Sequence, residues 1–334
     1  MIFPVGKLPS DILDRMLKAY TSSGRNIVVG PSIGEDATAI DIGDRYLLVK
    51  TDPITFVTED IGTYTININA NDIATMGGKP LWFLATILLP EKHTTPELVE
   101  GVFQQLSHAC QKIGVSLCGG HTEITSGMDR PIVVGVMLGE VEKDALITTS
   151  GAKAGDDILL TKAIAIEGTS IIVREKAEEL KGIFGEDFVK QCKRFIEDPG
   201  ISVLKEAEIA CQYGEVHCMH DPTEGGLATG LLEIAVAADK GLIIEEDNIP
   251  VLKECQTLCQ HYGLDPLGLI ASGTLLITLN PEDTQQVLKA LKSKGISATR
   301  IGKVLPKEDG LKMKRGDQLV ALPRFNRDEI TKIF

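Results

Sequence analysis

The sequence lacks an excess of positive charge. Among its 334 residues, 34 are Lys or Arg and 47 are Asp or Glu, which gives a formal net charge of −13. Nucleic acid and anionic membrane surfaces would repel a chain of this charge, so we expect neither as a partner. An anionic substrate would need local compensation, either from magnesium or from the N-termini of helices.

Long hydrophobic runs are also missing. No stretch stays apolar for the roughly 20 residues that a membrane-spanning helix needs. The first ten residues show no basic segment followed by an apolar one, as a signal peptide would. We therefore predict a cytoplasmic location and no membrane partner.

The seven cysteines form no regular framework. An odd, irregular set favours reduced thiols over a disulfide scaffold. A zinc site is conceivable, because Cys255 and Cys259 are four residues apart and Cys218 lies two residues before His220. Without a second matching pair of ligands, buried structural thiols are the preferred interpretation.

The length of the chain exceeds that of one ordinary hydrophobic core, and a turn-rich stretch at 148–156 suggests a boundary. We predict two domains, residues 1–150 and residues 151–334. In the first, the order β-β-α-β-α-β-β predicts an α+β sandwich with helices against one face of a sheet. In the second, alternating helices and strands predict an α/β domain.

The expected elements follow from hydrophobic periodicity and from the residues at their ends. Helices are expected at 10–20, 64–76, 97–113, 201–211, 225–238, 251–262 and 282–294. Strands are expected at 46–50, 82–89, 131–141, 157–161, 216–219, 242–244, 274–279 and 299–304. No internal repeat interrupts this pattern.

An acidic turn, Gly34-Glu35-Asp36, is the first candidate for a ligand site. Glycine lets the backbone approach a ligand closely, and adjacent carboxylates supply the hard oxygen ligands that a magnesium–phosphate group needs. A plain hairpin turn explains the same residues. Thr51 and Asp52 follow the strand expected at 46–50, and polar groups at the end of a strand commonly face a ligand.

Two further positions have both a structural and a functional interpretation. Asn71 and Asp72 interrupt the apolar pattern of the helix expected at 64–76, and the pattern alone favours a solvent-facing side over a site. Lys7 could reach a phosphate, but a lysine near the end of a chain is usually only solvated.

The stretch 220–227 is the most informative part of the second half. Proline is tolerated early in a helix, and the adjacent Gly225 and Gly226 leave backbone N–H groups accessible at the positive end of the helix dipole. Asp221 or Thr223 could simply cap the helix, but capping does not explain the pair of glycines. We therefore expect an anion-binding helix start here.

Five motifs in this order resemble the aminoimidazole ribonucleotide (AIR) synthetase, or PurM-like, superfamily. They are Gly-Glu-Asp-Ala at 34–37, Thr-Asp at 51–52, Asn-Asp-Ile-Ala-Thr-Met-Gly at 71–77, Gly-Gly-His-Thr at 119–122 and Asp-Pro-Thr-Glu-Gly-Gly-Leu at 221–227. The superfamily includes selenophosphate synthetase, thiamine-monophosphate kinase and the HypE-like hydrogenase maturation proteins of the carbamoyl dehydratase type, and the resemblance is nearest to the HypE-like branch. It implies an N-terminal α+β domain whose sheet joins that of a second subunit in a barrel, a C-terminal α/β domain, and ATP with Mg²⁺ in the cleft between them.

The motifs and the resemblance together assign roles to individual residues. The expected metal ligands are Asp36, Asp52, Asp72 and Glu123. The expected nucleotide contacts are Gly34, Glu35, Asp36, Thr51, Asn71, Gly119, Gly120, Thr122, Thr223, Gly225 and Gly226. Asp221 and Glu224 are candidates for positioning the acceptor or handling protons, although each could cap the helix, and His121 is a candidate donor to a phosphate.

The sequence departs from its relatives in two ways. His121 stands where several relatives carry an acidic residue, and histidine is a poor ligand for magnesium, which leaves the number of metal ions open.

The C-terminal segment contains Pro323-Arg324-Phe325-Asn326 and no cysteine follows Cys259, whereas the hydrogenase maturation relatives end in Pro-Arg-x-Cys. No cysteine precedes Cys110 either, unlike in selenophosphate synthetase. We therefore expect no carbamoyl transfer to a C-terminal thiol of this chain.

The step common to the superfamily is transfer of the γ-phosphoryl group of ATP to a nucleophilic oxygen, often that of an amide or carbonyl group. We expect this chain to catalyse such a step on an unidentified small acceptor and, by the resemblance, to form a homodimer. Two alternatives stay open. One is a carbamoyl dehydratase that acts on a thiol of a partner protein, and the other is a non-catalytic nucleotide-binding regulatory or scaffold protein.

Overall fold

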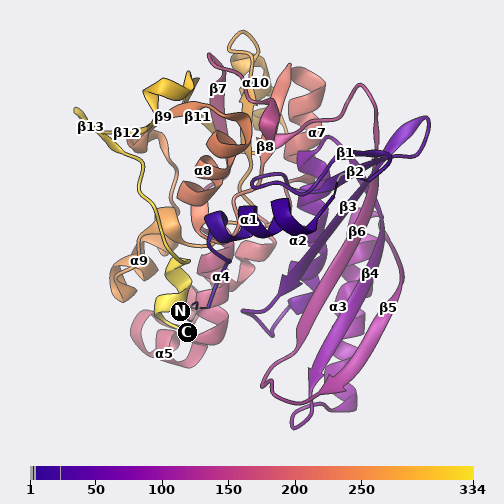
Figure 1. Cartoon of the computed structure of the whole chain (residues 1–334). Coiled ribbons are helices and arrows are strands. Elements are labelled where there is room, and N and C mark those ends of the chain that lie inside the picture. The colour runs from indigo at the N-terminus through magenta and orange to yellow at the C-terminus, as the bar shows by residue number, and fades with distance from the viewer. Residues whose placement is uncertain (1–2, 4, 23) are drawn as a thin grey trace.

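The computed structural model describes residue 3 and residues 5–22 and 24–334. Two β-sheets organise the molecule, one from each half of the chain, and helices pack against both (Figure 1). This combination of mixed sheets and helices confirms the predicted α+β class. None of the helices in the described part of the chain is both long enough and apolar enough to cross a membrane.

The N-terminal sheet has six strands in the order β1-β2-β3-β6-β4-β5. Neighbouring strands are antiparallel except β4 and β5, which run parallel. The strands are β1 (Ile27–Val29), β2 (Thr38–Asp41), β3 (Arg45–Ile54), β4 (Lys79–Pro90), β5 (Ser116–Thr125) and β6 (Ile132–Glu142). Strands β1 and β5 are therefore the two edges of this sheet as it is described.

Helices α2 (Ile61–Thr75) and α3 (Pro96–Ile113) cover one face of this sheet, and α1 (Ser10–Tyr20) lies between the two halves (Figure 1). Strand β6 shows the alternation that a half-covered sheet requires, because Val133 and Met137 are fully buried whereas Val134 and Val136 are only partly buried. The partly buried face is thus apolar as well.

Helix α2 is buried on nearly every side, because it packs against α3, β3, β6 and α7 (Leu204–Tyr213). The sequence pattern alone favoured a solvent-facing side for Asn71 and Asp72, but these residues are 0% and 3% exposed. A helix held between two halves of a molecule has no polar face, so its sequence pattern does not reveal which polar residues point into a site.

The C-terminal sheet has seven strands in the order β13-β12-β9-β11-β7-β10-β8, and only β12 and β9 run parallel. Its strands are β7 (Asp157–Thr161), β8 (Val216–His220), β9 (Gly241–Glu245), β10 (Leu276–Leu279), β11 (Ala298–Leu305), β12 (Leu311–Arg315) and β13 (Gln318–Ala321). The remaining helices are α4 (Ile166–Glu175), α5 (Ala177–Phe184), α6 (Glu186–Lys193), α8 (Gly226–Ala238), α9 (Lys253–Tyr262) and α10 (Thr284–Ser293).

Strand β7 shows why this second sheet is covered on both faces. Its Ile158 and Leu160 join one hydrophobic cluster and Leu159, between them, joins another. A continuous apolar run is typical of a strand with both faces buried. The sequence analysis did not anticipate helices α4 to α6 or strands β12 and β13.

Candidate functional site

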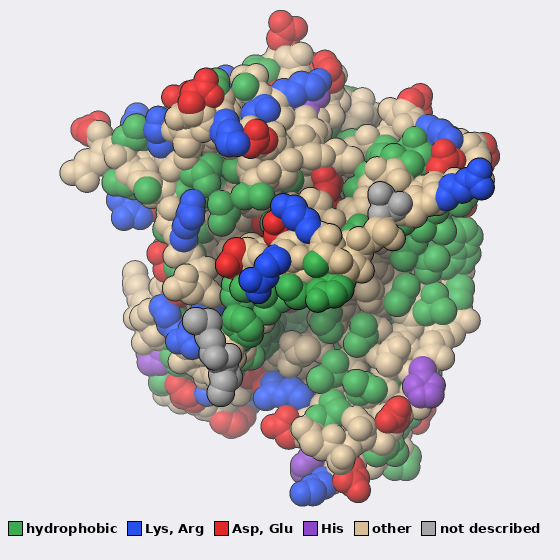
Figure 2. Space-filling model, in the orientation of Figure 1, with side chains coloured by type: hydrophobic (Ala, Val, Ile, Leu, Met, Phe, Trp, Pro, Cys, Tyr) green, Lys and Arg blue, Asp and Glu red, His purple; other side chains and the backbone are tan. Residues whose placement is uncertain are grey.

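A cavity of about 890 Å³ lies between the two halves of the molecule, a volume in the range of small-ligand sites. Figure 2 shows the surface hollowed between these halves. Residues far apart in the sequence line the cavity, among them Lys50, Asp72, Glu167, Asp221, Gly225 and Asp328. Because both halves and the C-terminal segment contribute, this cavity is the candidate functional site.

Three carboxylates converge at one end of the cavity, and we call Asp36, Asp72 and Asp221 the acidic cluster. Each offers an oxygen atom, and these atoms all lie within 4.8 Å of one another. Asp36 follows the turn at Gly34, Asp72 projects from α2, and Asp221 directly follows β8. The sequence analysis placed Asp36 and Asp72 together as metal ligands, and the structure adds Asp221, which we had expected to act on the acceptor.

The acidic cluster is deeply buried and incompletely paired. Asp36 Oδ2, Asp72 Oδ2 and both oxygens of Asp221 have no hydrogen-bond partner among the described residues. Burial raises the pKa of Asp221 to about 8, and the Asp36 carboxylate adds to this shift. Burial also raises the pKa of Asp72 well above its ordinary value, although Lys50 opposes the shift. Buried carboxylate oxygens without partners cost free energy unless a cation binds them, and carboxylates are the ligands that Mg²⁺ prefers, so the cluster fits this ion.

Asp52 lies beside the acidic cluster rather than in it, with a lysine between. Lys50 Nζ is 3.1 Å from Asp72 Oδ1 and 3.4 Å from Asp52 Oδ2. Burial alone would lower the pKa of Lys50, but the carboxylates of Asp72, Asp52 and Asp36 raise it above its ordinary value. The predicted trio of Asp36, Asp52 and Asp72 is thus divided, because Asp52 faces an ammonium group.

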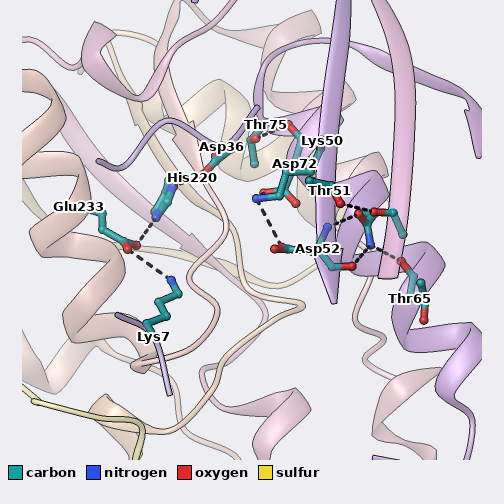
Figure 3. A network of polar contacts seen from close by, with 12 residues as sticks. Lys7, Asp36, Lys50, Thr51, Asp52, Thr65, Asp72, Thr75, His220 and Glu233 are labelled. Atoms are coloured by element: carbon teal, nitrogen blue, oxygen red, sulfur yellow. Dashed lines mark hydrogen bonds and ion pairs between the residues drawn. The ribbon is translucent and has the colours of Figure 1, made fainter. Parts of the chain in front are cut away.

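A chain of polar contacts extends from the acidic cluster to the N-terminal segment (Figure 3). His220 Nδ1 lies 2.7 Å from Asp36 Oδ1, and His220 Nε2 lies 3.0 Å from Glu233 Oε2. Lys7 Nζ donates to Glu233 Oε1 at 3.3 Å, and Lys7 N donates to Glu224 Oε1 at 3.0 Å. The prediction that Lys7 is only solvated is therefore wrong, because Lys7 ties the N-terminal segment to α8.

These contacts also control protonation. Burial alone would lower the pKa of His220, but Asp36 and Glu233 raise it well above its ordinary value. Burial opposes ionisation of Glu233, yet Lys7 and His220 together lower the pKa of this carboxyl to about 2. The contacts thus favour a charged imidazolium next to the acidic cluster.

The glycine pair at the start of α8 meets the cavity at Gly225, and we call this part the glycine end. The backbone N–H groups of both glycines already have partners. Gly225 N donates to Asp328 Oδ2 at 2.6 Å, and Gly226 N donates to the Thr223 carbonyl oxygen at 3.0 Å. The predicted open anion-binding helix start is therefore closed in this structure by a carboxylate of the chain itself. Burial raises the pKa of Asp328 to about 6, although the N–H groups that it accepts from oppose the shift.

Two further acidic side chains line this part of the cavity. Burial raises the pKa of Glu167, at the start of α4, to about 7, and Ser272 opposes this shift. Glu167 Oε2 has no hydrogen-bond partner among the described residues. Burial also raises the pKa of Glu224, one of the predicted acceptor-handling residues, although Lys7 opposes the shift. The Glu167 carboxyl group can therefore exist in either protonation state near neutral pH.

Several predicted nucleotide contacts have structural partners instead. Thr51 Oγ1 donates to the Gly135 carbonyl oxygen on β6 at 2.8 Å, and Thr51 does not line the cavity. Asn71 Nδ2 donates to the Ile201 carbonyl oxygen, and Asn71 Oδ1 accepts from Val203 N. Thr51 thus holds strands together and Asn71 clamps α2 to the loop before α7.

The acidic turn has a mixed role. Both oxygens of Glu35 accept from backbone N–H groups, those of Thr149 and Ser150, each at 3.1 Å. Gly34 has φ +88°, and an added Cβ would lie 2.7 Å from the Glu233 carbonyl oxygen, so only glycine allows the turn to approach α8 this closely. Of the three turn residues, Asp36 alone offers an unpaired oxygen.

The residues Gly119, Gly120, His121, Thr122 and Glu123 do not reach the cavity. They belong to β5, and all five residues are exposed. The family resemblance implied a glycine turn near the triphosphate at Gly119 and Gly120, but both residues lie within strand β5. An added Cβ on Gly120 would lie within bonding distance of the neighbouring strand, at 1.8 Å from the Ala85 carbonyl oxygen, so this glycine permits the close pairing of β5 with β4. Within one chain the structure brings neither His121 nor Glu123 to the acidic cluster.

Sequence reasoning missed four residues of the cavity. Lys50 stands two residues before Asp52 on β3, and that spacing places both on one face of a strand, which was an available signal. His220 directly precedes Asp221 in the quoted motif. No local pattern marks Glu167 or Asp328, because their partners come from distant parts of the chain.

The fold and the cavity define a two-domain protein with a carboxylate-lined cavity between its halves. Residues 34–141 match the family model described as AIR synthase related protein, N-terminal domain, and residues 153–314 match the model described as AIR synthase related protein, C-terminal domain. The chain is 30% identical to the carbamoyl dehydratase HypE of Cupriavidus necator, over 82% of this chain and 76% of that protein. The chain therefore belongs to the AIR synthase related family, as its motifs predicted.

Other comparisons agree with this assignment. The chain is 28% identical to the hydrogenase expression/formation protein MJ0676 of Methanocaldococcus jannaschii, over 95% of this chain and 94% of that protein. Its fold resembles HypE solved in a HypE–HypF complex, with a TM-score of 0.77 at 22% identity over 95% of this chain and 100% of that chain. It also resembles HypE solved in complex with ATP, with a TM-score of 0.73 at 23% identity over 94% of this chain and 91% of that chain.

Proposed function

We propose that this chain is an ATP-dependent, Mg²⁺-dependent enzyme that transfers the γ-phosphoryl group of ATP to the oxygen of an amide or another carbonyl acceptor. The observation that carries the proposal is the acidic cluster, whose four buried oxygens have no hydrogen-bond partner within the described chain and border one cavity. That a related HypE was solved in complex with ATP supports the choice of nucleotide.

Phosphoryl transfer depends mainly on positioning and on neutralising charge. Asp36, Asp72 and Asp221 would hold Mg²⁺, which neutralises charge on the phosphate oxygens when bound. The acceptor oxygen forms a bond to the γ-phosphorus while the bond from that phosphorus to ADP breaks. If the acceptor is a primary amide, its nitrogen loses one proton, and our candidates to receive it are Glu167 and Glu224, which both line the cavity.

A protein-borne acceptor is a second candidate. A relative is a carbamoyl dehydratase, and HypE has been solved in complex with another protein, HypF. In this chain the C-terminal segment that lines the cavity contributes Arg324, Phe325 and Asn326 and no cysteine. Because no cysteine is among the described residues that line the cavity, we propose for this second candidate a carbamoylated thiol supplied by a partner protein.

ADP release separates these possibilities. The purified chain is incubated with ATP and MgCl₂ together with a panel of small primary amides and, separately, with a partner protein carrying a carbamoylated cysteine. ADP formed with a small amide supports the first candidate, and ADP formed only with the carbamoylated protein supports the second. Nucleotide binding without ADP under every condition would favour a regulatory or scaffold role, and Asp72→Asn serves as the inactive control.

We also infer that two copies pair through the N-terminal sheet. The sheet face opposite α2 and α3 carries Trp82, Leu84, Val136 and Leu138, and Trp82 and Leu84 are 38% and 36% exposed. Figure 2 shows hydrophobic side chains gathered on this side of the molecule. An apolar face beside an edge strand suits a second copy of the same sheet.

Light scattering coupled to size-exclusion chromatography tests the dimer. We expect the mass of two chains for the unmodified protein and of one chain for Leu84→Asp. Ile183→Asp, at an exposed apolar position on α5, is the matched control and should leave the dimer intact. A single-chain mass for the unmodified protein would overturn this inference without affecting the proposed chemistry.

A further inference from the structure

Lys50 is an unusual neighbour for a cation site, because an ammonium group lies where carboxylate oxygens converge. Its Nζ is 3.1 Å from Asp72 Oδ1 and 3.4 Å from Asp52 Oδ2, and its side chain is only 20% exposed (Figure 3). Lys50 and Asp52 reach this position from the same face of β3, while Asp72 reaches it from α2.

The two oxygens of Asp72 have different surroundings. Oδ1 contacts the Lys50 ammonium, whereas Oδ2 has no hydrogen-bond partner among the described residues. Asp36 Oδ2 and both oxygens of Asp221 are also unpartnered among the described residues, and one oxygen of each of the three carboxylates lies within 4.8 Å of the others. Asp72 therefore gives one oxygen to the lysine and keeps the other free for a cation.

Charge and distance prevent a divalent cation from binding between Asp52 and Asp72 while Lys50 is there. Magnesium–oxygen distances are about 2.1 Å, so a divalent cation that bridged Asp52 and Asp72 would lie within about 4 Å of Lys50 Nζ and would repel it strongly. The four carboxylates of Asp36, Asp52, Asp72 and Asp221 share one ammonium, so a single divalent cation brings the group close to neutrality.

We propose that the Lys50 ammonium replaces a second divalent cation between Asp52 and Asp72, so that the protein itself holds one divalent cation, on Asp36, Asp72 and Asp221. In the nucleotide complex, Lys50 contacts a phosphate oxygen directly. This last step rests on the proposed function, whereas the number of metal ions bound by the protein alone does not.

Binding of MnCl₂ to the nucleotide-free protein tests the number of ions. Bound Mn²⁺ is counted by electron paramagnetic resonance of the unbound ion during titration. We expect one tight site per chain in the unmodified protein and in Lys50→Arg, which keeps the charge, and two sites in Lys50→Met. Lys143→Met is the matched control, because Lys143 pairs with Asp41 in the same half of the molecule, at 2.7 Å, and should leave one site.

Two results would overturn the proposal: two tight sites in the unmodified protein, or one site in a Lys50→Met variant that circular dichroism shows to be folded. If Lys50→Met does not fold, the counts for the unmodified protein and for Lys50→Arg still decide, since two sites in either one contradict the proposal.

Nucleotide affinity provides the second measurement. At a fixed, low MnCl₂ concentration we expect Lys50→Met to bind ATP about tenfold more weakly, because a charge-assisted contact is lost, and added MnCl₂ should restore most of the affinity. Equal ATP affinity in Lys50→Met and the unmodified protein would refute the phosphate contact. If the unmodified protein binds one Mn²⁺ but no ATP, the proposed function fails and the single-ion site stands.

Discussion

The two ends of the cavity differ in how their polar groups are satisfied. At the end formed by Asp36, Asp72 and Asp221, four buried oxygens have no hydrogen-bond partner in the described chain. At the other end, the N–H groups of Gly225 and Gly226 both donate to acceptors within the chain. The first end therefore keeps carboxylate oxygens free, whereas a ligand that bound the Gly225 N–H group at the second end would have to displace Asp328.

This difference has an energetic consequence. A buried carboxylate without a compensating partner lowers the stability of the folded protein, and the protein retains such groups where a ligand later binds them. A buried N–H group that donates to a carboxylate stabilises the folded protein in the absence of ligand. At the acidic end the unpaired carboxylates lower stability until a ligand binds, and at the glycine end a ligand must replace a hydrogen bond that stabilises the folded chain.

The largest effect is expected from Asp221→Asn. Removing one of three metal ligands should lower the rate of ADP formation by about 10³-fold or more, because the cation that neutralises the phosphates is lost. The same substitution removes an unpaired buried charge, so the metal-free variant should unfold at a Tm several degrees higher at pH 8, about 2–4 °C for each kcal/mol gained.

Asp144→Asn, in an exposed turn after β6, is the matched control and should change neither quantity. If Asp221→Asn lowers the Tm of the metal-free protein at pH 8, the Asp221 carboxylate does not destabilise the folded protein as its lack of partners indicates.

The second prediction concerns pH. The pKa of Asp221 is about 8 in the folded chain, against an ordinary value of 3.8, so the folded metal-free protein keeps a proton that the unfolded chain has released. The stabilisation that comes from this bound proton is therefore complete below about pH 4 and is lost as the pH rises to about 8. A divalent cation competes with that proton, so the rise in Tm caused by MnCl₂ should be roughly 5 °C larger at pH 8 than at pH 5. A Tm rise that does not depend on pH would show that the cation binds elsewhere.

The contrast between the two ends also explains how far sequence reasoning could go. Aspartate is a metal ligand wherever it is brought close to others, so Asp36 and Asp72 could be chosen from residue type and motif before the fold was known. The state of the Gly225 N–H group depends on Asp328, which lies 103 residues further along the chain. No local pattern reports a contact over that separation.

The same reasoning separates correct from incorrect predictions of secondary structure. Helices with one apolar face, such as α1 and α3, were predicted almost to their ends because the periodic pattern was complete. Gly119 and Gly120 were expected near the triphosphate because the family resemblance implied a glycine turn there. In β5 they instead allow close pairing with β4. That requirement comes from a neighbouring strand, so the local sequence does not show it.

A third, smaller effect is expected from Asp328→Ala, which opens the glycine end. The Gly225 N–H group becomes available and a nearby negative charge disappears, so ATP should bind about threefold to tenfold more tightly. The C-terminal segment loses an anchor, which should reduce the free energy of unfolding by about 1–2 kcal/mol.

Glu329→Ala is the matched control for this change. Glu329 accepts from Asp265 N at 2.9 Å in the same segment but does not contact Gly225, so its loss should reduce stability without tightening ATP binding. Isothermal titration calorimetry measures the affinities and thermal unfolding measures the stabilities. Weaker ATP binding in Asp328→Ala would mean that Asp328 helps to hold the nucleotide and that the glycine end is not closed against it.

The smallest effect is expected from Thr51→Val, between Lys50 and Asp52 on β3. Alternation along the strand sends Lys50 and Asp52 into the cavity and Thr51 to the opposite face, where its hydroxyl donates to the Gly135 carbonyl oxygen. Valine keeps the shape but not that hydrogen bond, so the free energy of unfolding should fall by about 1 kcal/mol while the Kd for ATP stays within about twofold. A large loss of ATP affinity would mean that β3 presents its other face to the nucleotide. The acidic end and the glycine end would then not account for all of the nucleotide contacts.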